Sequence, residues 1–462
     1  MRTLIAQPMA RTVWLGFATL FLCLPAVYNG FLFLFFDSFD YLANGLKVLH
    51  TLTTGKPYGL YGYRSNFYSL FLGMGYATAH SLWIVPLVQG AILSYILWVC
   101  FRVVSPGRPA VLFLGQVGFL SLATSASWFV SFVMPDVFAA ILILAAFLLG
   151  PGRRDLGRGE IRTVLAAALT VPVLVIARLH RRPGDGFVSG AVLGGLVVVA
   201  LLLTAGMTAA LYGRPGLFRD SPPFLLARSI GDGPGRAFIR EHCGRTHYAI
   251  CALADDVPTT ASQFLWGDRS ILKTASPDLL RQIRDEELGL VLAATRQYPL
   301  WQLKQSLGNF TRQLLAVDLS SFEGRDEYDE QVSGIIRRHQ AAYRRSRQHT
   351  HALPLRALTA IHQGVLCAAL PVSVWVAYQA WRLSRSRLVE LAVIVGFGVV
   401  SNAWITGVFS NVLGRYQARV AWLVVAVGLQ LFGIGRRMEP TPREGGYGGA
   451  ELVVGCPNDP NC

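Results

Sequence analysis

Long stretches without a charged residue constrain this chain more than any other feature of its sequence. No residue between Arg11 and Asp37 is charged, and this run exceeds the about 20 apolar residues that a helix needs to cross a bilayer. Charged residues make up 15% of the chain and hydrophobic residues 53%, whereas soluble domains carry about 25% charge. This composition excludes an ordinary soluble enzyme, a disordered chain and a small secreted scaffold held by disulfides.

Similar apolar runs recur along the chain and predict an all-α polytopic membrane protein with about 9–11 transmembrane helices. A shorter apolar run at 67–79 predicts a helix that lies in the membrane interface. The predicted spans are residues 13–36, 82–101, 110–132, 137–150, 161–177, 187–211, 356–381, 389–410 and 419–434.

These spans divide the chain into four parts. The first is an N-terminal membrane core over residues 1–211, which includes an external loop at 37–81. A small, mainly helical extramembrane region follows at 212–355. The chain ends with C-terminal membrane helices at 356–435 and a flexible tail at 436–462.

The extramembrane region has three local features of its own. Its periodicity predicts helices at 277–297 and 299–317, each with a proline in its first turn. Basic residues at 337–345 predict a helical face that is either solvated near lipid headgroups or binds them. Cys243 and Cys251 can pair as a disulfide if the region faces an oxidising compartment.

The net charge of +15 is attributed to basic loops, which orient membrane helices and meet anionic or phosphate-bearing lipids. We expect no nucleic-acid partner, because no basic module interleaved with aromatic residues is present. Arg2 and Arg11 place the N-terminus inside and Asp37 outside. Three concordant loops near the C-terminus place the extramembrane region outside, whereas counting two spans through 161–211 places it inside. The external placement is favoured because the three loops agree.

Three acidic residues stand at predicted membrane boundaries. Asp37 and Asp40 follow the first predicted span, where acids also serve simply to end a helix and face water. Asp136 is the one charge between Pro109 and Gly152, and a lone charge there marks either a functional site or an external turn. The predicted orientation puts all three on one membrane face. Carboxylates gathered at one site can hold a divalent metal or act as a general base.

Basic residues supply a second set of candidates. Arg178 and His180 belong to a cluster that serves equally well as an orienting loop or as a phosphate site. Arg415 and Tyr416 precede Arg419 in a loop predicted to be external, where positive charge does not serve orientation. Because the planar guanidinium donates hydrogen bonds in pairs, these residues favour phosphate binding.

Four short segments carry a resemblance to a known family. They read Asp37-Ser38-Phe39-Asp40-Tyr41-Leu42-Ala43, Gly55-Lys56-Pro57-Tyr58, Tyr63-Arg64-Ser65-Asn66-Phe67-Tyr68 and Met134-Pro135-Asp136-Val137-Phe138-Ala139-Ala140. Their order resembles the first external loop and the second acidic motif of GT-C glycosyltransferases, which use polyprenyl-phosphate sugars. Aminoarabinose and oligosaccharide-type transferases of bacterial inner membranes are similar proteins. The family commonly has Arg-Pro-Pro-Gly-Tyr-Pro in the third segment, so Ser65 and Asn66 depart from its pattern.

The resemblance implies a GT-C-like membrane core and roles for the candidate residues. Asp37 would be the catalytic base or an acid near a metal, and Asp136 a second acid of the same site. Apart from the resemblance, Asp40 is the catalytic candidate if Asp37 serves only to end the first span. Arg64 and Arg415, with the adjoining Tyr416, would bind the donor phosphate. The chain departs most from the family after residue 177, so the phosphate role of Arg178 and His180 is in doubt. A divalent metal, Mg²⁺ or Mn²⁺, between Asp37 and Asp136 is left open.

Three classes of function fit the sequence. The predicted one is a multi-pass glycosyltransferase of the bacterial inner membrane, whose partners are a polyprenyl-phosphate-linked sugar donor, a lipid or glycan acceptor and membrane lipids. The alternative is a transporter or flippase for a lipid-linked or polar solute, against which stand the lack of repeated halves and the boundary position of the acids. A non-catalytic assembly protein would leave the coincidence of three acids unexplained.

Overall fold

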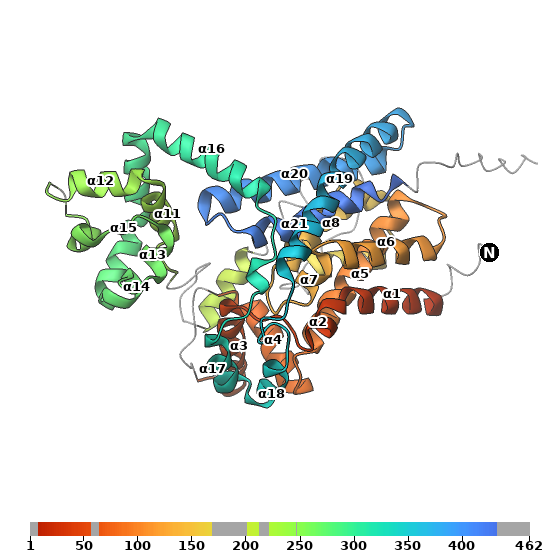
Figure 1. Ribbon diagram of the computed structural model, residues 1–462, viewed down its shortest axis with the longest axis horizontal. Helices are drawn as coiled ribbons and strands as arrows, with labels where there is room; N and C mark the ends of the chain where they lie inside the picture. The colour runs from red at the N-terminus through yellow and green to blue at the C-terminus, as the bar shows by residue number, and fades with distance from the viewer. Residues whose placement is uncertain (1–7, 57–63, 169–200, 212–220, 246, 432–462) are drawn as a thin grey trace, which may run out of the picture.

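The chain folds into an assembly of helices, shown in Figure 1. Its regular secondary structure is helical, and the one extended pairing within the described part is an isolated bridge between Phe33 and Phe132. The predicted all-α class is therefore confirmed for this part of the chain. The computed structural model describes residues 8–56, 64–168, 201–211, 221–245 and 247–431.

Three helices are long and apolar enough to cross a membrane: α5 (Ile84–Val104), α19 (Leu355–Arg382) and α20 (Ser386–Phe409). They coincide with three predicted spans and indicate a membrane protein. The other predicted spans form shorter helices in the described part, or extend beyond it. The larger number of crossings therefore stays a prediction.

Shorter helices pack beside these three in a bundle, whose helices lie side by side in Figure 1. Buried side chains of α1, α5, α6, α8, α19, α20 and α21 form one continuous apolar core. The shorter helices of this part are α1 (Pro8–Leu22), α2 (Leu24–Asn29), α6 (Ala110–Ala123), α7 (Ala126–Val130), α8 (Val137–Leu149), η1 (Pro151–Asp155), α9 (Arg158–Ala168), Leu201–Leu211 and α21 (Gly414–Gly428).

The first predicted span, 13–36, is wrong as a single helix. The helix α1 ends at Leu22, and the chain starts again as α2 with Pro25 in its first turn. Gly30 ends α2 at φ 80°, in the left-handed region that glycine adopts without a steric penalty. Residues 31–34 are then buried inside the protein. An apolar run that fills a protein core has the same composition as one that faces lipid, so the sequence did not distinguish them.

The predicted span 110–132 is wrong in the same way. The helix α6 ends at Ala123, Thr124 is extended, and the short helix α7 follows before a loop. The predicted span 161–177 coincides with the end of α9, and its second half lies outside the described residues.

The segment predicted as the external loop contains a helical hairpin of α3 (Phe36–Thr54) and α4 (Asn66–Ala79). The two helices approach so closely that a Cβ on Gly45 would overlap the backbone of α4. The Asn44 side chain of α3 donates a hydrogen bond to Asn66 of α4 at 3.1 Å. This close packing fixes α3 against α4, and α4 confirms the helix predicted at 67–79.

The predicted extramembrane region contains two helical clusters. The helices α11 to α15 enclose an apolar core of their own, whereas α17 and the turn α18 pack against α3 and the chain before it. The long helix α16 joins the first cluster to the bundle, as Figure 1 shows. The helices of this region are α11 (Phe224–Asp232), α12 (Pro234–His242), η3 (Ala249–Asp256), α13 (Ala261–Trp266), α14 (Ile271–Thr274), α15 (Pro277–Gln297), α16 (Pro299–Leu315), η4 (Ser320–Phe322), α17 (Glu327–Ile335), η5 (Arg337–His339) and α18 (Gln340–Arg344).

The structure bears on all three local predictions for this region. The helices α15 and α16 confirm the predicted helices and their first-turn prolines. Cys243 and Cys251 form a disulfide with a Cα–Cα distance of 5.2 Å, which confirms that they can pair. The arginines at 337–345 are exposed on the consecutive helical turns η5 and α18, where Arg344 pairs with Asp329. A basic helical face is therefore present, and its contact with lipid headgroups stays a prediction.

We expect Gly45→Ala to destabilise the protein, because the added Cβ would overlap the backbone of α4. Overpacking of this kind costs about 1–3 kcal/mol. Thermal unfolding of the purified protein in detergent measures the loss. Gly16→Ala is the control, since its Cβ meets nothing within 4 Å and alanine improves helix propensity. Equal midpoints for the two variants would contradict the close packing of α3 and α4.

Candidate functional site

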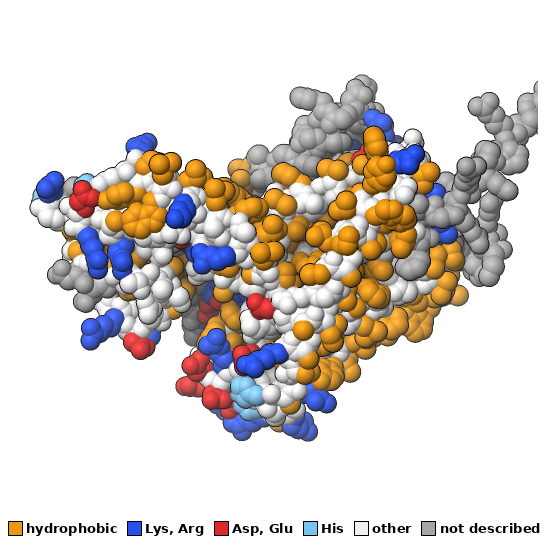
Figure 2. Space-filling model, turned by 45° about the horizontal axis from the view of Figure 1, so that its top comes forward, with side chains coloured by type: hydrophobic (Ala, Val, Ile, Leu, Met, Phe, Trp, Pro, Cys, Tyr) orange, Lys and Arg blue, Asp and Glu red, His pale blue; other side chains and the backbone are white. Residues whose placement is uncertain are grey.

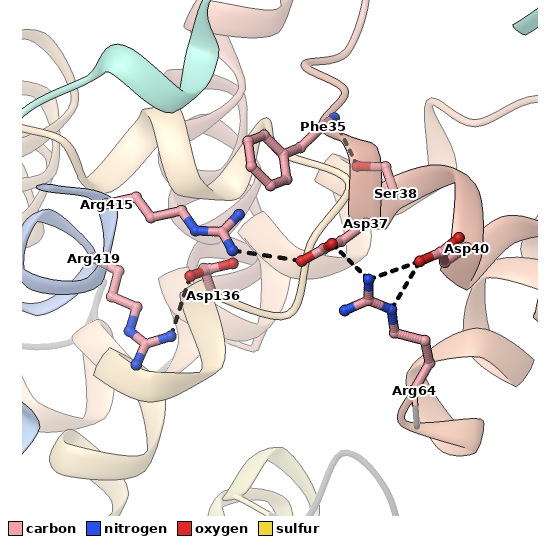
Figure 3. Close-up of polar contacts among 8 residues, drawn as sticks. All are labelled: Phe35, Asp37, Ser38, Asp40, Arg64, Asp136, Arg415 and Arg419. Carbon is pink, nitrogen blue, oxygen red and sulfur yellow. Dashed lines mark hydrogen bonds and ion pairs between the residues drawn. The ribbon is translucent and has the colours of Figure 1, made fainter. Parts of the chain in front are cut away.

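Three carboxylates and three guanidinium groups lie near one another in two sets of ion pairs, drawn in Figure 3, and we call the six residues together the charge chain. The carboxylates come from the first turns of α3 and from the start of α8. The guanidinium groups come from Arg64, two residues before α4, and from the first turns of α21. The first set links Asp40, Arg64, Asp37 and Arg415, and the second links Asp136 to Arg419.

The first part of the charge chain joins the two helices of the hairpin. Asp37 lies in the first turn of α3, where the positive end of the helix dipole favours a negative charge. Ser38 fixes this turn, because its hydroxyl accepts a hydrogen bond from the Phe35 backbone N–H at 3.0 Å. Arg64 Nη2 lies 2.6 Å from Asp37 Oδ1 and 2.7 Å from Asp40 Oδ2. Burial alone would lower the pKa of Arg64, but the two carboxylates raise it above its ordinary value.

Arg415 is the last member of the first set and is almost fully buried. Its Nη2 lies 3.5 Å from Asp37 Oδ2, which is the longest link in the series. Its guanidinium stands over the Phe35 ring, 4.2 Å from the centroid. The Nε and Nη1 atoms of Arg415 are buried and find no hydrogen-bond partner among the described residues. Arg415 therefore holds buried donors that an anionic ligand can satisfy.

The last part of the charge chain lies between α8, α20 and α21. Asp136 begins α8 and is 4% exposed, and Arg419 Nη1 lies 3.2 Å from its Oδ1. Arg419 Nη2 also donates to Asn402 Oδ1 at 3.0 Å. The Tyr416 ring lies beside both arginines, 5.1 Å from each guanidinium carbon.

Residues that the sequence did not single out hold the start of α21 in place. Gln313 of α16 is fully buried, and its side chain both donates to Leu413 O and accepts from Leu413 N, each at 2.9 Å. The Asp318 carboxylate lies so close to Gly414 that a Cβ there would overlap it. Asn402 donates to Tyr416 O at 2.7 Å. Asn402 could have been noticed as a polar residue within an apolar run, but no local signal marks Gln313 or Asp318.

The structure joins four of the predicted site residues by ion pairs, namely Asp40, Arg64, Asp37 and Arg415, and Tyr416 adjoins the last of them. Asp136 pairs with Arg419 instead. Asp37 and Asp136 pair with two different arginines of α21, and the prediction that they face one cavity stays a prediction. The prediction that Asp37 ends a span is wrong, because it opens α3. Arg178 and His180 lie outside the described residues.

The acids of the charge chain were also predicted to be able to hold a metal. No group of three or more His, Cys, Asp or Glu side chains in the described ranges is placed to do so. Guanidinium groups already meet oxygens of both Asp37 and Asp136. A Mg²⁺ or Mn²⁺ ion therefore stays a prediction, and no step below depends on one.

Fold and site together define, in the described part, an all-helical protein with helices able to cross a membrane and a largely buried group of three acids paired with three arginines. Comparison with models of protein families, with curated proteins and with solved structures finds no match to this chain. The functional argument therefore depends on the site itself.

We expect Asp136→Asn to destabilise the protein much more than Asp40→Asn. Asp136 is 4% exposed, whereas the Asp40 side chain is 31% exposed and Arg64 keeps Asp37 as a partner. Removing one member of a buried ion pair costs about 3–5 kcal/mol, and an exposed pair contributes about 0–1 kcal/mol. Thermal unfolding in detergent compares the two variants. Similar losses would show that Asp136 is not held in the charge chain as described.

Proposed function

We propose that the chain is a membrane glycosyltransferase that moves a sugar from a polyprenyl-phosphate donor to an acceptor hydroxyl at the outer face of the bacterial inner membrane. The observation that carries this proposal is the buried Arg415, whose Nε and Nη1 lack partners beside the carboxylate of Asp37. An acid and a cationic clamp at one place are what this transfer requires.

The donor phosphate would take up the unused donors of Arg415. An unsatisfied buried donor costs about 1–3 kcal/mol, and hydrogen bonds from a guanidinium to an oxyanion are among the strongest in proteins. Arg64 lies on the other side of Asp37 and supplies a second positive charge. Tyr416 closes the arginine side of this phosphate site with its ring.

Binding of the phosphate would also release the acid. The contact between Arg415 and Asp37 Oδ2 is the longest in the charge chain, at 3.5 Å, so it is the link that a competing anion breaks most readily. Asp37 Oδ2 would then be free to accept a hydrogen bond from the acceptor hydroxyl. Binding of the donor would thus free Asp37 to act as the base in its own transfer.

The transfer itself is a displacement at the anomeric carbon. The acceptor oxygen forms a bond to that carbon while its proton passes to Asp37. The bond between the anomeric carbon and the phosphate oxygen breaks, and the polyprenyl phosphate leaves with the electron pair. Arg415 and Arg64 stabilise the charge that develops on this leaving group.

Replacement of Asp37 by Asn tests the proposed base. The change keeps the size of the side chain and removes its charge, so consumption of donor should fall by about 10²–10⁴-fold. The assay is a membrane preparation supplied with a panel of polyprenyl-phosphate sugars and analysed for the released polyprenyl phosphate. Asp329→Asn is a matched control, because Asp329 also forms an arginine pair, with Arg344, outside the charge chain.

Undiminished donor consumption by Asp37→Asn would refute the role of Asp37 as the base. The same assay separates the proposal from a transporter or flippase. Movement of a lipid-linked sugar across vesicles, without release of polyprenyl phosphate by the unaltered protein, would favour transport and overturn the transferase.

The proposed outer location has a test of its own. After reduction of intact spheroplasts, Cys243 and Cys251 should react with a membrane-impermeant thiol reagent, because an oxidising compartment is where their disulfide persists. Lysed spheroplasts give the full labelling for comparison. Labelling only after lysis would place this cluster in the cytoplasm.

A further inference from the structure

The helix α16 places its polar and apolar residues in the opposite way to a helix on the surface of a water-soluble protein. Its buried residues are polar: Ser306, Asn309 and Gln313. Four leucines on the opposite face are exposed, at 80%, 52%, 48% and 74% of their surface for Leu300, Leu303, Leu307 and Leu315. Their spacing places them along one stripe of the helix. We call these four residues the leucine stripe.

Such an arrangement is unfavourable in water but typical of lipid. Water-soluble proteins bury leucine and seldom expose a continuous apolar patch without a partner. Between helices in a membrane, by contrast, small and polar residues form the interface. The contact between α16 and α20 is of this kind, since Gly407 of α20 packs directly against Asn309 and Gln313.

The leucine stripe continues the exposed apolar surface of a helix able to cross the membrane. Phe310 of α16 contacts Trp404 of α20, with ring centroids 5.6 Å apart. Along α20, Val393 and Phe397 are exposed as well. Figure 2 shows hydrophobic side chains extending along one face of the molecule from the α11–α15 cluster toward the helices of the bundle.

The charged residues of α16 also favour contact with lipid. The helix α16 contains Lys304 and Arg312 and no acidic residue. Basic side chains beside an apolar stripe are attracted to anionic lipid headgroups, as in amphipathic helices at membrane surfaces. Contact with a second protein would not by itself require that the charged residues of α16 all be basic.

We propose that the leucine stripe of α16 lies in the lipid at the outer boundary of the bilayer and holds the α11–α15 cluster at the membrane. The partner is the bilayer itself, with anionic headgroups beside Lys304. Because Gln313 of the same helix binds Leu413, lipid would also steady the segment from which Arg415 projects.

Spin labels on single cysteines test this placement in the full chain. The background variant is Cys367→Ser, because Cys367 is exposed while Cys23 and Cys100 are buried and Cys243 and Cys251 are bridged. Labels are placed by Leu303→Cys and Leu307→Cys, with Asp268→Cys as a fully exposed control. The proteins are reconstituted into vesicles of phosphatidylcholine and phosphatidylglycerol.

Collision rates with oxygen, which partitions into lipid, and with a water-soluble nickel complex then locate each label. Labels at 303 and 307 should collide several-fold more with oxygen than with the complex, and the control should show the reverse. Free access of the complex to both stripe positions would overturn the proposal. Shielding from both reagents would also overturn it, because it would indicate a protein partner or a second copy. Leu315→Cys, at 74% exposure, repeats the test if either variant fails to fold.

Discussion

The charge chain from Asp40 to Arg419 is the interaction on which the site depends. Its three carboxylates and three guanidinium groups cancel in charge, so charges that would be costly to bury singly are tolerated together. Its arginines join different parts of the sequence: Arg64 joins the segment before α4 to α3, Arg415 joins α21 to α3, and Arg419 joins α21 to the start of α8. The same ion pairs therefore hold these helices together and balance the charges of the site.

The positions of the charged residues at helix ends explain why other segments must hold the first turn of α21 in place. The carboxylates of Asp37 and Asp136 sit at helix N-termini, where the dipole favours them. Arg415 stands in the first turn of α21, where the same dipole opposes a positive charge. Asp318 against Gly414 and Gln313 on Leu413 secure this turn from α16 and the segment that follows it. The helix that carries the leucine stripe is thus also part of the framework of the site.

The sequence predicted the parts of this protein that depend on local composition. Long apolar runs located α5, α19 and α20, and first-turn prolines located α15 and α16, because length and capping act over a few residues. The break in 13–36 was missed, since burial in protein and burial in lipid select the same residues. Isolation in apolar surroundings revealed Asp136, but Gln313 gave no signal. Its partner Leu413 is 100 residues away, and only the folded chain brings them together.

The neutrality of the charge chain also bears on how the proposed reaction would be controlled. Both oxygens of Asp37 meet a guanidinium group, so an acceptor hydroxyl entering alone finds the base occupied. An arriving phosphate adds negative charge to a balanced site, and it gains a cationic partner only if an arginine turns toward it from a carboxylate. Arg415 has the longest contact to lose and the unsatisfied donors to gain. The order of events, with donor before acceptor activation, would then follow from electrostatics without a moving lid.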